Sequence, residues 1–174
     1  EARATPERLP ELESGGLRHD PELWSELASS DLLGIALPEA VGGSGGGFLE
    51  LGVLLSEVGW SVAPVPVYAT LVLGADPIAR HGDADLQQQY LPGVIDGTLI
   101  AGMAMSEPDA GTDVLGMKMT ARPDGDSFIL NGTKAWITNG PVGHLFLVYA
   151  KLDRDNPRSM SAFLVESGYE GFTA

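Results

Sequence analysis

The sequence contains no cysteine, and this absence excludes disulfide scaffolds, thiolate metal sites and cysteine nucleophiles. Basic residues are also scarce: 10 lysines and arginines stand against 24 aspartates and glutamates, which gives a net charge of −14. A chain this acidic lacks the clustered basic side chains that nucleic-acid phosphates require. The charge favours solubility, with docking to a basic redox partner as the alternative.

Long apolar runs are absent as well. No stretch of about 18 apolar residues occurs, so we expect no membrane span. Residues 1–17 are mixed and polar and show no signal-peptide pattern, which makes a soluble cytoplasmic protein the expectation. The three histidines, His19, His81 and His144, are far apart and lack the spacing of metal ligands, so no metal site is predicted.

The chain changes character near Gly97. Before it, the patterns are helical: an Asp-Pro pair at residues 20–21 predicts the start of a helix that Gly34 closes. Asp83 predicts the start of another helix, which Pro92 is expected to stop. Residues 70–81 are predicted to be helical with a break. A further apolar helical stripe comprises Leu51, Leu54, Leu55 and Val58.

After Gly97 the pattern favours strands. They are expected at residues 98–105, 117–122, 127–130, 133–138, 145–149 and 161–165. A turn is predicted at residues 123–126, and Asn131-Gly132 is the strongest hairpin signal in the chain. Helices followed by strands indicate an α+β protein, with an all-helical domain over residues 1–97 and an antiparallel β-barrel domain over residues 98–174.

The glycine run at residues 42–47 contains the pattern G-x-S-x-G, which is typical of a serine-hydrolase nucleophile elbow. That motif needs a strand before it, a helix after it and partner Asp and His residues. The preceding segment is interrupted by Pro38, and no histidine lies in a suitable setting. We therefore interpret the run as a flexible connector between two helices.

Two segments carry the strongest functional signal. The first, residues 103–113, reads Met-Ala-Met-Ser-Glu-Pro-Asp-Ala-Gly-Thr-Asp and lies where a strand ends. Glu107-Pro108 predicts a turn, Gly111 allows a ligand to approach the backbone, and Ser106 and Thr112 offer hydroxyl groups. Taken alone, the segment is equally consistent with a polar β-turn.

The second segment, residues 134–140, reads Lys-Ala-Trp-Ile-Thr-Asn-Gly. On a strand, Trp136 and Thr138 would point to the same side. An aromatic plane beside a hydroxyl donor suits the ring of a flavin. A core tryptophan next to a turn threonine is the structural alternative.

Together, S-E-P-x-A-G-[ST]-D and N-G-x-K-x-W-I-T-N-G resemble the acyl-CoA dehydrogenase family. The resemblance covers nearly the whole chain, since residues 32–39, the glycine run and residues 89–92 are similar to that family's helical N-terminal domain. Residues 159–166 are similar to a later strand of its barrel.

The resemblance implies an FAD enzyme that desaturates acyl-CoA thioesters between the α and β carbons. Flavin N5 would accept the hydride while a carboxylate removes the α-proton. The implied cofactor-binding residues are Met103, Met105, Ser106, Gly111, Trp136, Ile137 and Thr138. Thr112 would contact the acyl-CoA, and Thr138 would donate a hydrogen bond near N5. Ser106 stands where threonine is more usual, and Met103 departs from the aromatic or small residues often found there.

Family members continue into a C-terminal four-helix domain that carries the catalytic carboxylate and most oligomer contacts. The resemblance therefore implies that this chain ends within the β domain, lacks a first helix and contains no catalytic residue. We expect the 174 residues alone to be inactive and to bind FAD weakly. An electron-transferring flavoprotein is the implied electron acceptor, and a homotetramer or heterotetramer is the implied assembly.

Three alternatives remain open within this architecture. Flavin monooxygenases and acyl-CoA oxidases share it but react with oxygen. A non-catalytic subunit of a heteromeric dehydrogenase would keep the fold without the chemistry. The apolar residues 62–73, with Pro64 and Pro66, resemble members that act on bulky or steroid-derived CoA esters.

Overall fold

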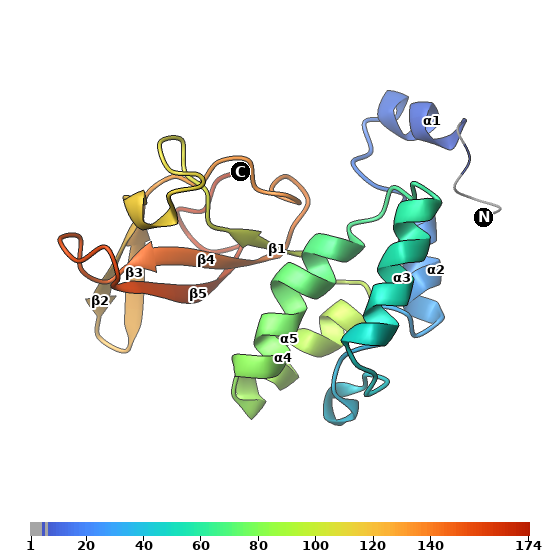
Figure 1. Ribbon diagram of the computed structural model, residues 1–174, viewed down its shortest axis with the longest axis horizontal. Coiled ribbons are helices and arrows are strands. Elements are labelled where there is room, and N and C mark those ends of the chain that lie inside the picture. The colour runs from blue at the N-terminus through green and yellow to red at the C-terminus, as the bar shows by residue number, and fades with distance from the viewer. Residues whose placement is uncertain (1–4, 6) are drawn as a thin grey trace. The chain divides into compact units, whose positions relative to one another are not determined.

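The computed structural model describes residue 5 and residues 7–174. It divides into two compact units, Glu1–Ala101 and Gly102–Ala174. The first is helical and the second is built on a β-sheet (Figure 1). None of the described helices is long and apolar enough to cross a bilayer.

The helical unit contains five α-helices among the described residues: α1 (Arg8–Ser14), α2 (Pro21–Ser29), α3 (Phe48–Trp60), α4 (Asp76–His81) and α5 (Ala84–Ile95). Two other helical segments, the 3-10 helix η1 (Glu39–Val41) and the π-helix η2 (Tyr68–Ala75), lie between them. Residues 70–81 were expected to be helical with a break, and the change from π- to α-helix occurs there, between Ala75 and Asp76. Helix α1 was not expected from the polar sequence of residues 1–17.

Capping by aspartate sets the start of two helices, as predicted. Asp20 accepts hydrogen bonds from the backbone amides of Glu22 and Leu23, at 3.0 and 3.1 Å. Asp83 accepts one from the amide of Leu86 at 2.9 Å. These carboxylates satisfy amides that have no partner in the first turn of a helix.

The predicted helix ends were wrong. Helix α2 ends at Ser29, before Gly34, and α5 continues through Pro92 to Ile95. Leu91 and Val94 are fully buried on either side of that proline. Burying each side chain contributes about 1.5–3 kcal/mol, which together exceeds the roughly 3 kcal/mol that an internal proline costs.

The glycine run is ordered, which corrects its interpretation as a flexible connector. Four successive amides, from Gly43 to Gly46, donate backbone hydrogen bonds to carbonyls of residues 34–38 at 2.9–3.0 Å. A Cβ at Gly43 would lie 2.2 Å from the Leu37 carbonyl oxygen. The run is therefore glycine-rich at this point because two backbone segments touch.

The β unit contains strands β1 (Ala101–Ala104), β2 (Thr120–Asp124), β3 (Ser127–Asn131), β4 (Leu145–Lys151) and β5 (Met160–Glu166). They form one sheet in the order β1-β4-β2-β3, with β5 also paired to β4 (Figure 1). β2–β3 and β4–β5 are antiparallel, whereas β2–β4 is parallel at Thr120 and Lys151. The two long pairings are antiparallel, as predicted, and the short β2–β4 contact is the one parallel pairing of these three.

Two predicted β elements are wrong. Asn131-Gly132 is not a hairpin turn, and residues 133–138 form an irregular loop instead of a strand. The hairpin turn lies at Gly125, with φ of 61°, within the turn predicted at residues 123–126. Gly132 serves a different purpose, because a Cβ there would lie within 2.8 Å of the Met119 backbone. The first strand is also shorter than predicted.

The core of the β unit lies against β4. Ala104, Phe146 and Val148 are its buried centre. Residues packed around them are Met119, Leu130, Ile137, Val165 and Phe172. Because Ile137 belongs to this group, the loop that follows β3 is anchored in the core at that residue.

Candidate functional site

The first predicted segment leaves the sheet at β1. Met103 is the third residue of that strand, and Met105 and Ser106 follow directly after it; all three side chains are partly exposed. The chain then turns tightly, with Glu107 and Ala110 exchanging backbone hydrogen bonds of 2.8 and 3.2 Å. The turn predicted from Glu107-Pro108 is confirmed.

The second segment carries an unusual tryptophan. Trp136 is 94% exposed and has a φ of 60°, a left-handed conformation that costs a non-glycine residue about 1–2 kcal/mol. Ile137, the next residue, packs into the core, and Thr138 is exposed again. The core alternative for Trp136 is therefore wrong, since its indole lies in solvent.

A turn centred on Asn139 ends this segment. Asn139 also has a positive φ, 65°, and its carbonyl accepts hydrogen bonds from the amides of Val142 and Gly143 at 3.0 and 2.6 Å. Asparagine tolerates this conformation better than most residues. The turn therefore fixes the chain immediately after Thr138.

The two segments lie side by side. The amide of Ala135 donates to the Ser106 carbonyl at 2.9 Å, and Lys134 Nζ donates to the Met105 carbonyl at the same distance. At Gly102, a Cβ would lie 2.8 Å from the Thr138 carbonyl oxygen. Strand β1 and its extension thus contact both ends of the second segment.

A buried ion pair holds this arrangement. Lys134 Nζ lies 2.9 Å from Glu107 Oε1, and the two side chains are 8% and 5% exposed. The Glu107 carboxylate also accepts hydrogen bonds from the amides of Lys118 and Met119, at 2.6 and 3.0 Å. Burial alone would raise the pKa of Glu107, but these amides and the ammonium outweigh it and lower the pKa below its usual range.

Gly111 and Thr112 lie apart from these contacts. Both are exposed, and a Cβ at Gly111 would meet nothing within 4 Å. Lys118 and Asp109 form an exposed ion pair of 2.8 Å nearby in the chain. No described hydrogen bond links residues 111–112 to the Trp136 segment.

Lys134 was not among the predicted site residues. Its partners are Met105 and Glu107, 29 and 27 residues earlier in the chain. No local pattern signals such a contact. The lysine in the motif at residues 131–140 was the available clue, and only its spatial surroundings give it a meaning.

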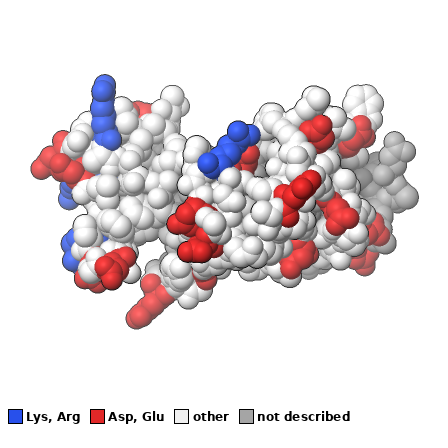
Figure 2. Space-filling view, turned by 90° about the horizontal axis from the view of Figure 1, so that it is seen from below, with Lys and Arg blue, Asp and Glu red and all other residues white. Residues whose placement is uncertain are grey.

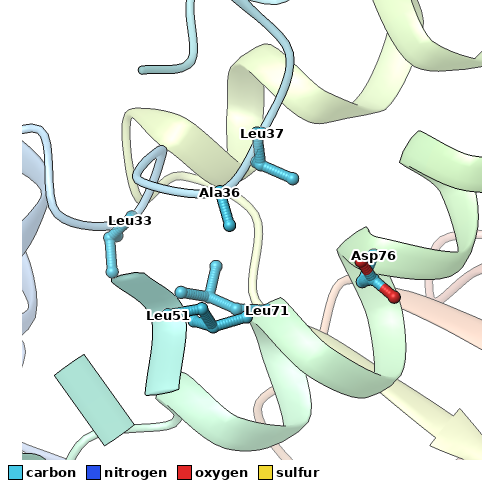
Figure 3. A pocket seen from close by; sticks show the side chains of 6 residues that line it. All are labelled: Leu33, Ala36, Leu37, Leu51, Leu71 and Asp76. Atoms are coloured by element: carbon cyan, nitrogen blue, oxygen red, sulfur yellow. The ribbon is translucent and has the colours of Figure 1, made fainter. Parts of the chain in front are cut away.

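Other sites receive less support from the described residues. They contain no group of three or more His, Asp and Glu side chains that could hold a metal ion. A small apolar cavity of about 10 Å³ lies in the helical unit, with Asp76 beside it (Figure 3). Its lining comprises Leu33, Ala36, Leu37, Leu51, Leu71 and Asp76. That volume is about the size needed for one water molecule, so it admits no organic ligand.

The surface charge agrees with the composition. On the face drawn in Figure 2, Asp and Glu side chains are scattered and Lys and Arg are few. The candidate site contributes no free cation, since Lys134 is committed to Glu107 and the Met105 carbonyl. Its exposed groups are an indole, hydroxyls and thioethers, a set suited to an uncharged planar ligand.

Comparison with known proteins gives two family matches. Residues 2–98 match the family model "Acyl-CoA dehydrogenase, N-terminal domain", and residues 102–174 match "Acyl-CoA dehydrogenase, middle domain". The matches together span nearly the whole chain. They agree with the division into a helical and a β unit.

Individual relatives point the same way. Mitochondrial isovaleryl-CoA dehydrogenase of Pongo abelii is 40% identical over 157 residues, which is 87% of this chain and 37% of that protein. A variant of the Tcur3481-Tcur3483 steroid ACAD has a TM-score of 0.86 and 44% identity over 98% of this chain and 45% of its own. An FAD complex of PigA has a TM-score of 0.80 and 32% identity over 93% and 43%. The chain thus spans less than half the length of these relatives.

Proposed function

The chain belongs to the acyl-CoA dehydrogenase family, and on that premise we propose that it forms part of an FAD-dependent enzyme that desaturates acyl-CoA thioesters between the α and β carbons. The observation that carries the proposal is the pairing of two segments around an exposed, strained tryptophan. Strain in an exposed residue has no packing benefit, which favours a role in binding.

The residues present fit a flavin. We propose that Trp136 covers one part of the isoalloxazine ring and that Met103 and Met105 contact another. Ser106 and Thr138 supply hydroxyl groups for its polar edge, and Thr138 donates near N5. Ile137 acts through its anchoring in the core, while FAD, when bound, supplies the acceptor for the hydride that leaves the β carbon.

Gly111 and Thr112 lie apart from the contacts that join the two segments, and we propose a different role for them. Their exposed loop suits contact with the boundary between cofactor and substrate, with Thr112 touching the acyl-CoA. Gly111 leaves open space where a side chain would stand, so a ligand can reach the backbone. These two assignments rest on the family motif and on exposure.

Glu107 is unsuited to act as the base. Its carboxylate accepts three hydrogen bonds, is buried and has a lowered pKa, so it is a weak proton acceptor. We therefore propose that these residues supply flavin and substrate contacts and that the carboxylate that removes the α-proton lies elsewhere. We further propose an electron-transferring flavoprotein as the acceptor and a tetrameric assembly.

The test is flavin content and turnover in the full-length protein that carries this sequence. It is expected to bind FAD and to reduce a dye acceptor in the presence of a CoA thioester. Because the named relatives include an isovaleryl-CoA dehydrogenase and a steroid ACAD, the screen should contain branched short-chain and steroid side-chain CoA esters.

Three outcomes would contradict parts of the proposal. A full-length protein that takes up no FAD would contradict the cofactor. Rapid peroxide formation in air would identify an oxidase instead of a dehydrogenase. Turnover by the verified 174-residue chain would show that the base lies within it.

A further inference from the structure

Lys134 connects three segments of the β unit. Its ammonium donates to the Met105 carbonyl and to Glu107 Oε1, each at 2.9 Å, and lies 3.9 Å from Met117 Sδ. Its side chain is only 8% exposed. An ammonium has three donors, and all three face partners inside the protein.

Glu107 extends the connection to the chain before β2. Its Oε2 accepts from the Lys118 amide and its Oε1 from the Met119 amide, while Oε1 also receives the lysine. The end of β1, the start of β2 and the Trp136 loop are therefore joined through one carboxylate–ammonium pair. Removing either partner would take away the one side-chain pair that contacts all three segments, while the Ala135–Ser106 backbone hydrogen bond and the packing of Ile137 would remain.

Stability alone does not account for such a pair. Apolar residues of similar volume often replace a buried ion pair with no loss of stability, whereas removing one partner costs about 3–5 kcal/mol. A charge-assisted network does fix geometry, because its hydrogen bonds are directional and short. The pair is thus better suited to positioning than to stabilising.

The position that it fixes is that of Trp136. Lys134 is two residues before this tryptophan, and its Nζ is held on the carbonyl that directly precedes Ser106. The neighbouring Ala135 amide is bonded to the Ser106 carbonyl. The Ala135 amide and the Ile137 side chain also hold this loop, but Lys134 is the side chain that reaches the Met105 carbonyl. We therefore expect the spacing between Trp136 and the Met105–Ser106 backbone to shift when Lys134 is removed.

We propose that Lys134, held by Glu107, is a positioning residue for the flavin, setting the spacing between the Trp136 loop and the Met105–Ser106 backbone. This inference rests on the proposed function. Lys134 itself touches neither the cofactor nor the substrate. Its removal should weaken FAD binding even where the fold is intact.

The experiment compares single and double substitutions in the full-length protein. Lys134→Met alone leaves Glu107 buried and unpaired and should lower the Tm strongly. Lys134→Met combined with Glu107→Gln removes both charges and should restore part of the Tm. The rest stays lost, because a carboxamide has one oxygen for the two backbone amides, Lys118 and Met119, that the carboxylate accepts from. If the pair positions the flavin, the double variant should still bind FAD about tenfold more weakly than the wild type, by equilibrium dialysis.

A matched control comes from the exposed ion pair in the same unit. Lys118 Nζ and Asp109 Oδ2 lie 2.8 Å apart, close to the 2.9 Å of the buried pair, but their side chains are 65% and 72% exposed. Lys118→Met combined with Asp109→Asn should change neither the Tm nor the FAD dissociation constant measurably, because exposed pairs contribute little.

The possible results distinguish a failure of the positioning role of Lys134 from a failure of the proposed FAD-dependent function. A wild-type protein that takes up no FAD overturns the proposed function and this inference with it. A double variant that folds and keeps wild-type FAD affinity overturns the inference alone. If the double variant does not fold, Lys134→Met measured below its own Tm decides, because unchanged FAD affinity of that folded variant would equally overturn the positioning role.

Discussion

Replacing Trp136 should separate folding from cofactor binding. Its indole is 94% exposed, so Trp136→Ala removes almost no buried surface and should change the free energy of unfolding by less than about 0.5 kcal/mol. Trp136→Gly also relieves the left-handed backbone at φ 60°. Removing the backbone strain should stabilise the protein by about 1–2 kcal/mol. The greater freedom of glycine in the unfolded chain costs about 0.5–1 kcal/mol. We therefore expect a net stabilisation of roughly 0.5–1 kcal/mol.

The effect on FAD should have the opposite sign. If a bound flavin covers about 100 Å² of the indole, the lost contact is worth about 2.5 kcal/mol at about 25 cal/mol per Å². That corresponds to a dissociation constant roughly 70-fold higher for both variants. Trp136→Phe keeps an aromatic face and should lose much less.

Two assays on the same samples test this prediction. Urea denaturation gives the free energy of unfolding, and equilibrium dialysis gives the FAD dissociation constant. Val62→Gly is the matched control, because Val62 is 68% exposed, has a φ of 50° and is not a predicted site residue. It should be stabilised similarly with unchanged FAD affinity.

The reasoning would be refuted by either of two results. Destabilisation of Trp136→Ala by more than about 1.5 kcal/mol would mean that the indole is packed and not exposed. An FAD dissociation constant within about twofold of wild type would mean that the indole does not contact the cofactor, since twofold is only about 0.4 kcal/mol.

Two further predictions concern the helical unit. The Arg8 guanidinium, 2.8 Å away, and two capping amides lower the pKa of Asp20 from 3.8 to about 2. The lowered pKa stabilises the folded protein by about 2 kcal/mol. This contribution is complete above pH 4 and is lost as the pH falls through 2. Urea titrations at different pH values should show the loss in the wild type and little of it in Asp20→Asn. Gly43→Ala should lower the free energy of unfolding by about 2 kcal/mol or more, because its Cβ would lie 2.2 Å from the Leu37 carbonyl oxygen. As the control, Gly52→Ala lies on the open surface of a helix and should raise the free energy of unfolding by about 0.5–1 kcal/mol in the same assay.

The starts of α2 and α5 were predictable from the sequence because their causes are local. Asp20 and Asp83 cap the helices that follow them through amides two or three residues away. Helix ends were less predictable, because α5 passes Pro92 through the burial of side chains against distant parts of the unit. A proline signal competes there with packing that no short window of sequence contains.

The strands show the same division between local and distant causes. Gly125 turns the β2–β3 hairpin as its local sequence predicted, but Gly132, in the stronger Asn-Gly pattern, does not turn. Gly132 is pressed against Met119, a contact that depends on how the strands are placed. A glycine needed for close approach and a glycine needed for a turn are indistinguishable in the sequence alone.

Strain by itself would not have identified the candidate site. Among the described residues, Val62 and Trp136 are both exposed and both in the left-handed region. Only Trp136 lies two residues from a buried ion pair that joins three segments. A strained backbone in an exposed segment with few restraints can relax at little cost. A strained backbone that a charge-assisted network holds in place cannot relax so easily. The coincidence of the two, at Trp136 and Lys134, is therefore the stronger indication that a ligand is to be positioned there.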